Sequence, residues 1–558
     1  MRLINTTTLG IEIFFDGHAP PYAILSHRWH DGEVSLQEME SGTAVERPGY
    51  AKIVQTCALA ARDGLGYAWV DTCCIDKTSS AELSVAINSM YRWYREAVVC
   101  YAFLSDVEFD DVEADAGAAA FSNSAWFSRG WTLQELLAPA KVEFYNVSWH
   151  KIGTKATLSA AIEAITGIDL IVLKGSARLS VFSIARRMSW AAGRKTTVPE
   201  DTAYCLFGLF GVNMPMLYGE GEKAFIRLQE EIMKNSEDQS LFAWTSKEPY
   251  AQGLLARSPD DFAACGDIVM VRKRWNRIPY SVTNLGLSIQ LPMMPWAMDT
   301  YLVTLDCRNE DEPDSRVAIF LRLLSRPNQL LRVPFEEGDR SVFKDEMVEK
   351  LTYRDVFVHQ PPPGVIMIPT PLYGFYLRNF SAPILTVRTT TDSEIPLSKV
   401  WSQCDWDDEK RLLELPVGES GTVGMISWSR QDGNGWFMKF GFDFEFNPVL
   451  QLGGDMVSPN RPLTMDPNSV EAWMNPTWMD GPAHSKYLHK ADRMIGLEEE
   501  VFIASMRISI MLEEIDDTGK RAWIVDIVDH KSKYPRHADL CEGYVNEGIS
   551  VRKLPKSS

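Results

Sequence analysis

Three short apolar segments near the start of the chain each end in polar residues. They cover residues 22–26, 67–71 and 98–104. Short runs that are apolar throughout are typical of strands buried on both faces of a parallel sheet. Between them, residues 51–61 and 81–96 carry apolar side chains at spacings of three and four, which predicts amphipathic helices. Strands that alternate with helices indicate right-handed crossovers and an open α/β sheet of parallel strands.

A fourth apolar segment, residues 142–145, follows a short helical pattern that begins near Thr132. In an open sheet of this kind, ligands bind at the carboxyl ends of the parallel strands. Residues 26–29 follow the first strand, and Asp71 ends the second. We therefore expect one edge of the sheet to gather the side chains with candidate chemistry, namely Ser26, His27, Arg28, Trp29, Asp71 and, from the short helix, Glu135.

The pattern changes twice further along the chain. Residues 157–235 have a helical period, which predicts a helical annex after the sheet. Beyond Leu255, apolar and polar residues alternate between frequent Pro and Gly, which predicts a β-rich region. The expected organisation is an α/β domain over residues 1–150, a helical extension over residues 151–250 and β-rich domains over residues 251–558.

Two segments have unusual compositions. Residues 110–120 are acidic and small, which predicts a loop beside the candidate edge. Residues 219–224 (GEGEKA) have the glycines of a phosphate-binding loop but not the G-x-x-x-x-G-K-[ST] spacing. Because their acidic side chains would repel phosphate, we interpret these residues as the turn that starts a helix.

Length and charge limit the function classes. The chain has 558 residues, too many for one hydrophobic core, so two or three domains are expected. Its formal charge of -19 repels polyanions, and no run of Lys and Arg offsets this charge, which argues against nucleic acid as a partner. No apolar stretch is long enough for a signal core or a bilayer span. We expect a cytoplasmic protein without a membrane span.

Cysteine and histidine patterns give no sign of a disulfide framework or a metal site. The nine cysteines show no C-x-x-C pair, and the nine histidines lack ligand spacing, so we expect reduced thiols, no metal and no bound cofactor. Cys73 and Cys74 would have His27 as a base if one of them were a nucleophile. Buried structural cysteines are the preferred interpretation.

Three ordered sequence blocks resemble a known family. Residues 22–29 (YAILSHRW), 68–76 (AWVDTCCID) and 129–136 (RGWTLQEL) look like the signature blocks of the fungal heterokaryon-incompatibility (HET) domain. Residues 201–210 and 216–225 are similar to segments that often follow this domain. The resemblance covers about the first 245 residues. It implies a role in fungal nonself recognition, a form of innate immunity in which an activated HET domain triggers programmed cell death after incompatible hyphae fuse.

The HET domain is in turn similar to the Toll/interleukin receptor (TIR) fold, which has a flavodoxin-like sheet. Several TIR proteins cleave NAD at the nicotinamide–ribose bond with one Glu on the helix after the third strand. Residues 131–136 (WTLQEL) match the TIR pattern Trp-Cys-x-x-Glu-Leu, except that Thr132 replaces Cys. The resemblance thus implies that Glu135 is catalytic and that NAD is a substrate rather than a cofactor.

Cleavage of a nicotinamide–ribose bond passes through an oxocarbenium-like state. A carboxylate beside the ribose stabilises that charge and orients the hydroxyls. No second acid is needed, because nicotinamide leaves a pyridinium as a neutral molecule. Glu135 would perform this task. The alternative is that Glu135 complements a helix dipole or forms a surface pair.

The residues at the strand ends are assigned to substrate binding. Arg28 would hold a pyrophosphate, and Trp29 would stack on a base or nicotinamide ring. Asp71 would accept a hydrogen bond from a ribose hydroxyl. The alternatives are core packing for Trp29 and Trp131 and a turn cap for Asp71. The complete predicted binding set is Ser26, His27, Arg28, Trp29, Asp71 and Trp131.

Two hypotheses about function come from different classes. In the first, the α/β domain is an NAD glycohydrolase that is switched on by self-association of the HET domain. In the second, the domain is a non-enzymatic signalling module that triggers death through assembly with a protein partner, whose identity and trigger the sequence does not reveal. A further idea is that the β-rich half restrains the first half, so that the first 245 residues alone would be more toxic.

Overall fold

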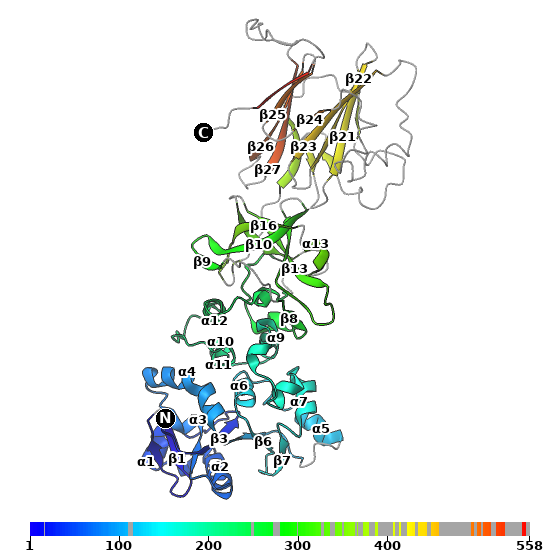
Figure 1. Ribbon diagram of the computed structural model, residues 1–558. Helices are drawn as coiled ribbons and strands as arrows, with labels where there is room; N and C mark the ends of the chain where they lie inside the picture. Colours follow the sequence, from blue (N-terminus) through cyan, green and yellow to red (C-terminus); the bar gives the residue numbers. More distant parts are fainter. Residues whose placement is uncertain are drawn as a thin grey trace. The chain divides into compact units, whose positions relative to one another are not determined.

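The computed structural model describes residues 1–362, with gaps at 16, 110–114, 247–249, 272–278, 298–299, 325–327, 335–340 and 349–350, then Val365 and the backbone of the strands between Leu372 and Lys553 (Figure 1). The chain divides into two compact units. The first comprises residues 1–292, 304–319 and 332–367, and the second residues 293–303, 320–331 and 368–558. The first unit contains every side chain assigned to the candidate edge.

A seven-stranded mixed sheet forms the core of the first unit, with the order β2-β1-β4-β3-β5-β6-β7. The four central strands are parallel, as predicted. All residues of β3, β5 and β6 are buried, which explains why their sequences are apolar throughout. The sheet also has antiparallel strands at both edges, which the sequence analysis did not predict. The strands are β1 (Arg2–Asn5), β2 (Ile11–Ile13), β3 (Tyr22–His27), β4 (Tyr67–Trp69), β5 (Val99–Phe103), β6 (Val142–Tyr145) and β7 (Lys151–Thr154).

Amphipathic helices connect these strands. The predicted apolar face of α2 is buried at Ile53, Cys57 and Ala60, and that of α4 at Ile87 and Met90. Apolar stripes at helical spacing therefore face the sheet, as expected. The connecting helices are α1 (Leu36–Ser41), α2 (Tyr50–Arg62), α3 (Asp71–Cys74), α4 (Ser80–Glu96), α5 (Asp115–Ser122) and α6 (Thr132–Leu137), with a 3₁₀ turn η1 (Ala44–Glu46).

The prediction of a loop over residues 110–120 is wrong for its second part, where α5 forms. The small residues of this segment are mostly alanine, which has the highest helix propensity. At the end of α5, Phe121 is completely buried and lies edge-on against Phe127 and Phe144, with ring centroids 5.0 and 5.5 Å away. One aromatic anchor thus gives the short helix the tertiary packing that it needs.

Short helices form the annex that follows the sheet. The residue Gly208 of α11 lies so close to α4 that an added Cβ would be 2.0 Å from the side chain of Tyr91. The annex helices are α7 (Ser159–Thr166), α8 (Leu170–Leu173), α9 (Ile184–Ser189), α10 (Asp201–Tyr204), α11 (Phe207–Phe210) and α12 (Lys223–Met233), with 3₁₀ turns η2 (Leu179–Val181), η3 (Gln239–Phe242) and η4 (Pro259–Phe262).

The glycine-containing turn before α12 binds an internal anion. Gly219 and Gly221 have φ angles of 102° and 61°, and both donate their backbone N–H groups to Glu200 Oε1, at 2.7 and 2.8 Å. Because α12 begins two residues later, at Lys223, the interpretation of this segment as a helix start is confirmed. The hydrogen bond from Gly221, with that from Gly219, lowers the pKa of Glu200.

The remainder of the chain is β-rich, as predicted, with one short helix, α13 (Asp345–Val348), among its described residues. In the second unit, two sheets have the orders β19-β20-β17-β27-β26-β25-β28 and β18-β21-β22-β23-β24. The strands after the annex are β8 (Ile268–Met270), β9 (Ser281–Thr283), β10 (Gly286–Ala297), β11 (Thr300–Thr304), β12 (Cys307–Asn309), β13 (Ser315–Leu323), β14 (Gln329–Val333), β15 (Ser341–Lys344) and β16 (Thr352–Val358). They are followed by β17 (Leu372–Arg378), β18 (Thr386–Arg388), β19 (Asp405–Asp407), β20 (Leu412–Glu414), β21 (Gly421–Ser429), β22 (Asn434–Phe442), β23 (Pro448–Met456), β24 (Arg493–Ile495), β25 (Glu499–Ile503), β26 (Met506–Glu514), β27 (Arg521–Asp529) and β28 (Ile549–Lys553).

Within the described residues, no helix is long and apolar enough to cross a bilayer. The seven cysteines of this part are buried and form no disulfide bond, as expected for reduced thiols. Cys404 and Cys541 lie outside the described residues.

Candidate functional site

Glu135 lies in a buried hydrogen-bond network behind the carboxyl end of β3. Ser26 is the second-last residue of β3. Its Oγ donates a hydrogen bond to Glu135 Oε2 at 2.5 Å and accepts one from Trp126 Nε1 at 2.9 Å. The hydroxyl of Tyr94, which donates to Leu25 O at 2.9 Å, also lies against the carboxyl. Glu135 is only 6% exposed. A surface ion pair, one of the alternatives for this residue, is therefore not what the structure shows.

Burial sets the ionisation of Glu135. Removal from water raises its pKa to about 8, against the hydrogen bonds from Ser26 and Tyr94, which lower it. The negative charge of Asp71 adds to the increase, and the positive charge of Arg129 opposes it. The group is therefore a neutral acid at pH 7 that ionises when a cation approaches or when water reaches it. Perturbed carboxyls of this kind are frequent at functional sites.

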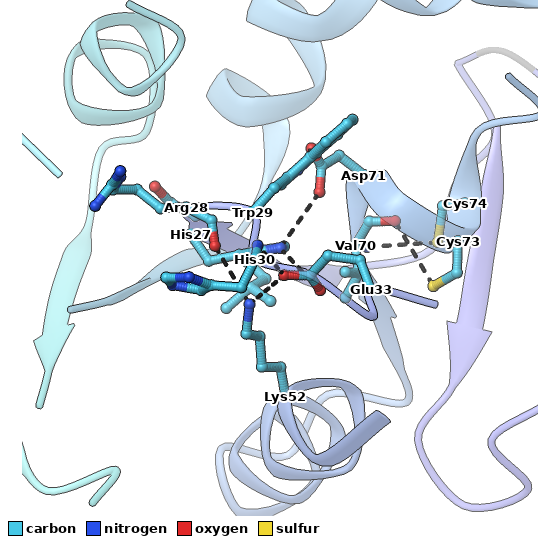
Figure 2. A network of polar contacts seen from close by, with 12 residues as sticks. His27, Arg28, Trp29, His30, Glu33, Lys52, Val70, Asp71, Cys73 and Cys74 are labelled. Carbon is cyan, nitrogen blue, oxygen red and sulfur yellow. Dashed lines mark hydrogen bonds and ion pairs between the residues drawn. The ribbon is translucent and has the colours of Figure 1, made fainter. Parts of the chain in front are cut away.

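Trp29 lies at the exposed part of the edge, and Asp71 lies beside it (Figure 2). The indole Nε1 of Trp29 donates to Asp71 Oδ2 at 2.8 Å, and Lys77 Nζ lies 3.6 Å from the centroid of the indole ring. Trp29 is 51% exposed, so core packing does not describe it. An indole fixed at its edge and half exposed is a preformed surface for a planar ring.

His27 occupies the buried centre of the same network. Its Nε2 lies 3.7 Å from Glu33 Oε2 and 4.0 Å from Asp71 Oδ1, and its side chain is 1% exposed. Lys52 forms an ion pair with Glu33 and donates to Arg28 O at 3.3 Å. Burial would raise the pKa of Glu33, but the hydrogen bonds and charges of His27 and Lys52 lower it to about 2. His27 is thus placed to orient carboxylates rather than to reach a ligand.

Arg28 and Trp131 lie away from these two networks. The side chain of Arg28 points away from the dashed contacts in Figure 2, and none of the described residues forms a hydrogen bond or ion pair with its guanidinium. Trp131 Nε1 donates to Asp201 Oδ2 at 3.1 Å, and Tyr218 donates to the other oxygen of that carboxyl at the same distance. Trp131 therefore joins the Glu135 helix to the annex, and the structure does not bring it to Trp29 or Asp71.

Cys73 and Cys74 are structural in their contacts. Cys73 Sγ lies 3.8 Å from Val70 O, and Val70 N donates to Cys74 Sγ at 3.4 Å (Figure 2). The hydrogen bond between the two cysteines, together with burial, raises the pKa of Cys73 well above its usual value. A protonated, buried thiol is a poor nucleophile, which agrees with the preferred interpretation.

Sequence reasoning missed four residues of the site. Tyr94 and Trp126 contact the Glu135–Ser26 pair. Glu33 and Lys52 form the ion pair beside His27. Glu33 had one usable signal, because it lies in the loop after a strand that already carried candidates. Lys52 lies one position from the buried residue Ile53 on an amphipathic helix, and nothing in that pattern marks it.

The site combines a buried carboxyl, that of Glu135, with an exposed aromatic ring, that of Trp29. Within the described ranges, no group of three His, Cys, Asp or Glu side chains has the geometry to bind a metal ion. The buried acid and the exposed edge are electrically coupled, since the charge of Asp71 acts on Glu135. Such a site can bind a planar, cationic group and stabilise positive charge next to it.

Comparisons with known proteins place the first part of the chain in a family. Residues 22–115 match the family model described as heterokaryon incompatibility protein (HET), and residues 223–252 match a domain of unknown function (DUF8212). Vegetative incompatibility protein HET-E-1 of Podospora anserina is 51% identical over 225 residues, which are 39% of this chain and 16% of that protein. No solved structure matches the chain.

The family match begins at the first residue of β3 and extends past β5, so it covers three of the four parallel strands and the Trp29–Asp71 edge but not α6. The high identity to a vegetative incompatibility protein agrees with the family model. This chain is therefore a protein with a heterokaryon-incompatibility (HET) domain of the fungal type.

Proposed function

We propose that the chain is an effector of fungal nonself recognition that acts in the cytoplasm and causes cell death by cleaving NAD at the nicotinamide–ribose bond. The similarity to the vegetative incompatibility protein HET-E-1 supports the biological role. The observation that carries the chemistry is the buried carboxyl of Glu135, which is hydrogen-bonded by Ser26 and has a raised pKa. A core that served packing alone would gain nothing from an ionisable group at this position.

Strand order supports a TIR-like, flavodoxin-like assignment of the sheet. The parallel strands lie in the order β4-β3-β5-β6, so that the second parallel strand of the chain precedes the first, third and fourth. This is the order of flavodoxin-like sheets, whose ligands bind where the order reverses, between the first and third strands. Here that point lies between β3 and β5, and Glu135 is on a helix between β5 and β6.

The mechanism follows from the charge of the substrate. A nicotinamide ring in NAD is a pyridinium cation, and its approach favours the ionised form of Glu135. As the C–N bond breaks, its electron pair goes to the ring nitrogen, and the carboxylate stabilises the positive charge that develops on the ribose. Water then adds to the ribose carbon and loses a proton, so the products are nicotinamide, ADP-ribose and H⁺.

The exposed edge supplies the binding groups. Trp29 presents an indole face for a planar ring, and Arg28 carries the cation for the pyrophosphate. Asp71 Oδ1 is buried and accepts no hydrogen bond from any described residue, which suits a ribose hydroxyl. Ser26 and His27 orient Glu135 and Asp71. Because Glu135 is 6% exposed, substrate reaches it only after the edge opens, a change that we assign to self-association of the HET domain.

The test is nicotinamide release from NAD by the purified full chain, free and clustered on a scaffold. Glu135→Gln keeps the size and removes the charge, so release should fall by at least about a hundredfold, as when a transition-state charge stabiliser is removed. Glu143→Gln is the matched control, because Glu143 is also buried in the sheet but pairs with Lys151. Equal rates for Glu135→Gln and the native chain would exclude the catalytic assignment.

The second candidate function is a non-enzymatic module that kills through assembly with a protein partner. The observation that favours it is the 6% exposure of Glu135, which keeps a substrate from reaching the carboxyl in this structure. In a fungal cell-death assay, killing by a folded Glu135→Gln variant would support this module. Loss of killing in that variant, with killing retained by Glu143→Gln, would support the enzyme.

A further inference from the structure

The helix that carries Glu135 cannot position it alone. Helix α6 has six residues and no side-chain hydrogen bond at its N-cap, Trp131. Helices of this length are not stable by themselves, so contacts from outside fix the carboxyl. Both ends of α6 are in fact bound by cations from elsewhere in the first unit, the partly buried Arg194 and the buried Lys155.

Arg194, from the annex, binds the start of α6. Its Nη1 donates to Arg129 O at 3.2 Å and to Thr132 Oγ1 at 3.3 Å, and its Nε donates to Trp190 O at 2.9 Å. Thr132 Oγ1 in turn donates to Trp126 O at 2.6 Å. One guanidinium thus connects the annex to the turn that leads into α6. Arginine suits this position because its planar fork binds several acceptors at once.

The annex segment around Arg194 also pairs with the chain before α6. Lys195 N donates to Ser128 O at 2.7 Å, and Gly130 N donates to Lys195 O at 2.9 Å, which forms a short parallel bridge. The approach is close, since a Cβ on Gly130 would lie 2.6 Å from Thr196 Cγ2. A glycine at this place in the signature block therefore lets the annex backbone reach the Glu135 helix.

Lys155 binds the other end of α6. Its Nζ donates to Leu136 O at 3.1 Å and forms a second hydrogen bond to Pro139 O. Lys155 is 6% exposed, and burial lowers its pKa to about 8. The last carbonyls of a helix lack partners within the helix and carry its negative dipole end, so a buried ammonium there satisfies both.

We propose that Arg194 and Lys155 are positioning residues for Glu135, so that the reactive site is completed by residues that follow α6 in the chain. This inference rests on the proposed catalytic role of Glu135. Arg194 also contributes its charge, because Glu135 and Arg194 interact electrostatically. Its loss should therefore make Glu135 harder to ionise, which a purely structural role would not do.

The first measurement is hydrogen exchange over residues 129–138 in the full chain. Arg194→Met and Lys155→Met should each accelerate exchange there by at least about tenfold, because each removes hydrogen bonds that hold local structure. Arg187→Met is the matched control, because Arg187 is another partly buried annex arginine and burial lowers its pKa to about 10. It donates to Leu209 O at 2.9 Å and forms no hydrogen bond or ion pair with α6. Exchange that stays unchanged in both test variants overturns the proposal.

The second measurement reads the ionisation of Glu135 without NAD. Thermal stability of the native chain is compared with that of Glu135→Gln as a function of pH, first alone and then with Arg194→Met in both. The difference between the two curves begins near the carboxyl pKa of the unfolded chain and stops growing near the pKa of folded Glu135. Arg194→Met should therefore move this upper limit to higher pH. An upper limit that stays in place counts against the electrostatic part of the proposal. If Arg194→Met unfolds, Arg194→Lys replaces it and should give an intermediate exchange rate. Nicotinamide release, in contrast, tests only the proposed function.

Discussion

At the scale of single residues, the site is defined by one buried carboxyl and by the groups that satisfy it. Ser26 and Tyr94 bind Glu135, yet burial still raises its pKa to about 8. The sequence identified Glu135 through the Trp-x-x-x-Glu-Leu spacing, and Ser26 through its place after a strand. It did not reveal that the carboxyl would lie inside the core, because a helix of six residues has no reliable apolar stripe to orient it.

The raised pKa has a direct consequence for stability. Between the usual carboxyl pKa of 4.5 and about 8, the folded chain keeps the proton of Glu135 and the unfolded chain loses it. Stability from this group is therefore complete below pH 4.5 and falls as the pH rises toward 8. Glu135→Gln has no such titration. The unfolding free energy of this variant, relative to that of the native chain, should therefore increase by roughly 2–4 kcal/mol between about pH 5 and pH 8. Denaturant titrations at several pH values measure the difference, and parallel curves would refute it.

At the scale of elements, the sequence predicted the strands that are buried on both faces and the helices that have one buried face. The apolar runs of β3, β5 and β6 and the stripe on α2 are confirmed. Edge strands β1, β2 and β7 were not predicted, since they are short and only partly buried. The contacts of Arg194 with α6 could not be predicted from the sequence either. A single arginine in a helical pattern gives no indication of its long-range partner.

Close packing of the annex on the sheet layer makes Gly208 sensitive to substitution. A methyl group there would overlap the Tyr91 ring, so Gly208→Ala should reduce the unfolding free energy by about 1–3 kcal/mol. Gly66→Ala is the control, because an added Cβ at Gly66 meets no atom within 4 Å and should change stability by less than about 0.5 kcal/mol. Guanidinium titration of both variants measures their unfolding midpoints. Equal midpoints would contradict this prediction and show that α11 moves away from α4 without loss of stability.

At the scale of the whole molecule, the first compact unit extends past the annex. Arg332 is 2% exposed and donates to Phe242 O at 2.9 Å and Trp244 O at 2.5 Å, and its guanidinium lies 3.8 Å from the Trp244 ring centroid. A fragment that ends at residue 245 lacks this cation and leaves the end of the annex without its partner. Residues 1–367 contain all of the first unit, together with the segments 293–303 and 320–331 that cluster with the second, so this fragment keeps the partner of Phe242 and Trp244.

This extension changes the test of whether the β-rich half restrains the first. The fragment of residues 1–245 should unfold at a lower denaturant concentration than residues 1–367, because the buried carbonyls of Phe242 and Trp244 lose their donor. Toxicity in hyphae should then be compared between residues 1–367 and the full chain. A stronger effect of the fragment supports restraint by the second unit. Equal midpoints for the two fragments would contradict the structural part of this prediction.

The glycine turn before α12 has one more consequence. Two backbone amides of the kind that elsewhere bind a phosphate are occupied here by the carboxylate of Glu200. Glu200 thus supplies the negative charge at this turn from within the chain. The two amides need no bound nucleotide to satisfy them. Under the proposed cleavage of NAD, a fall in NAD concentration would therefore leave this turn with its anion, because Glu200 is part of the chain itself.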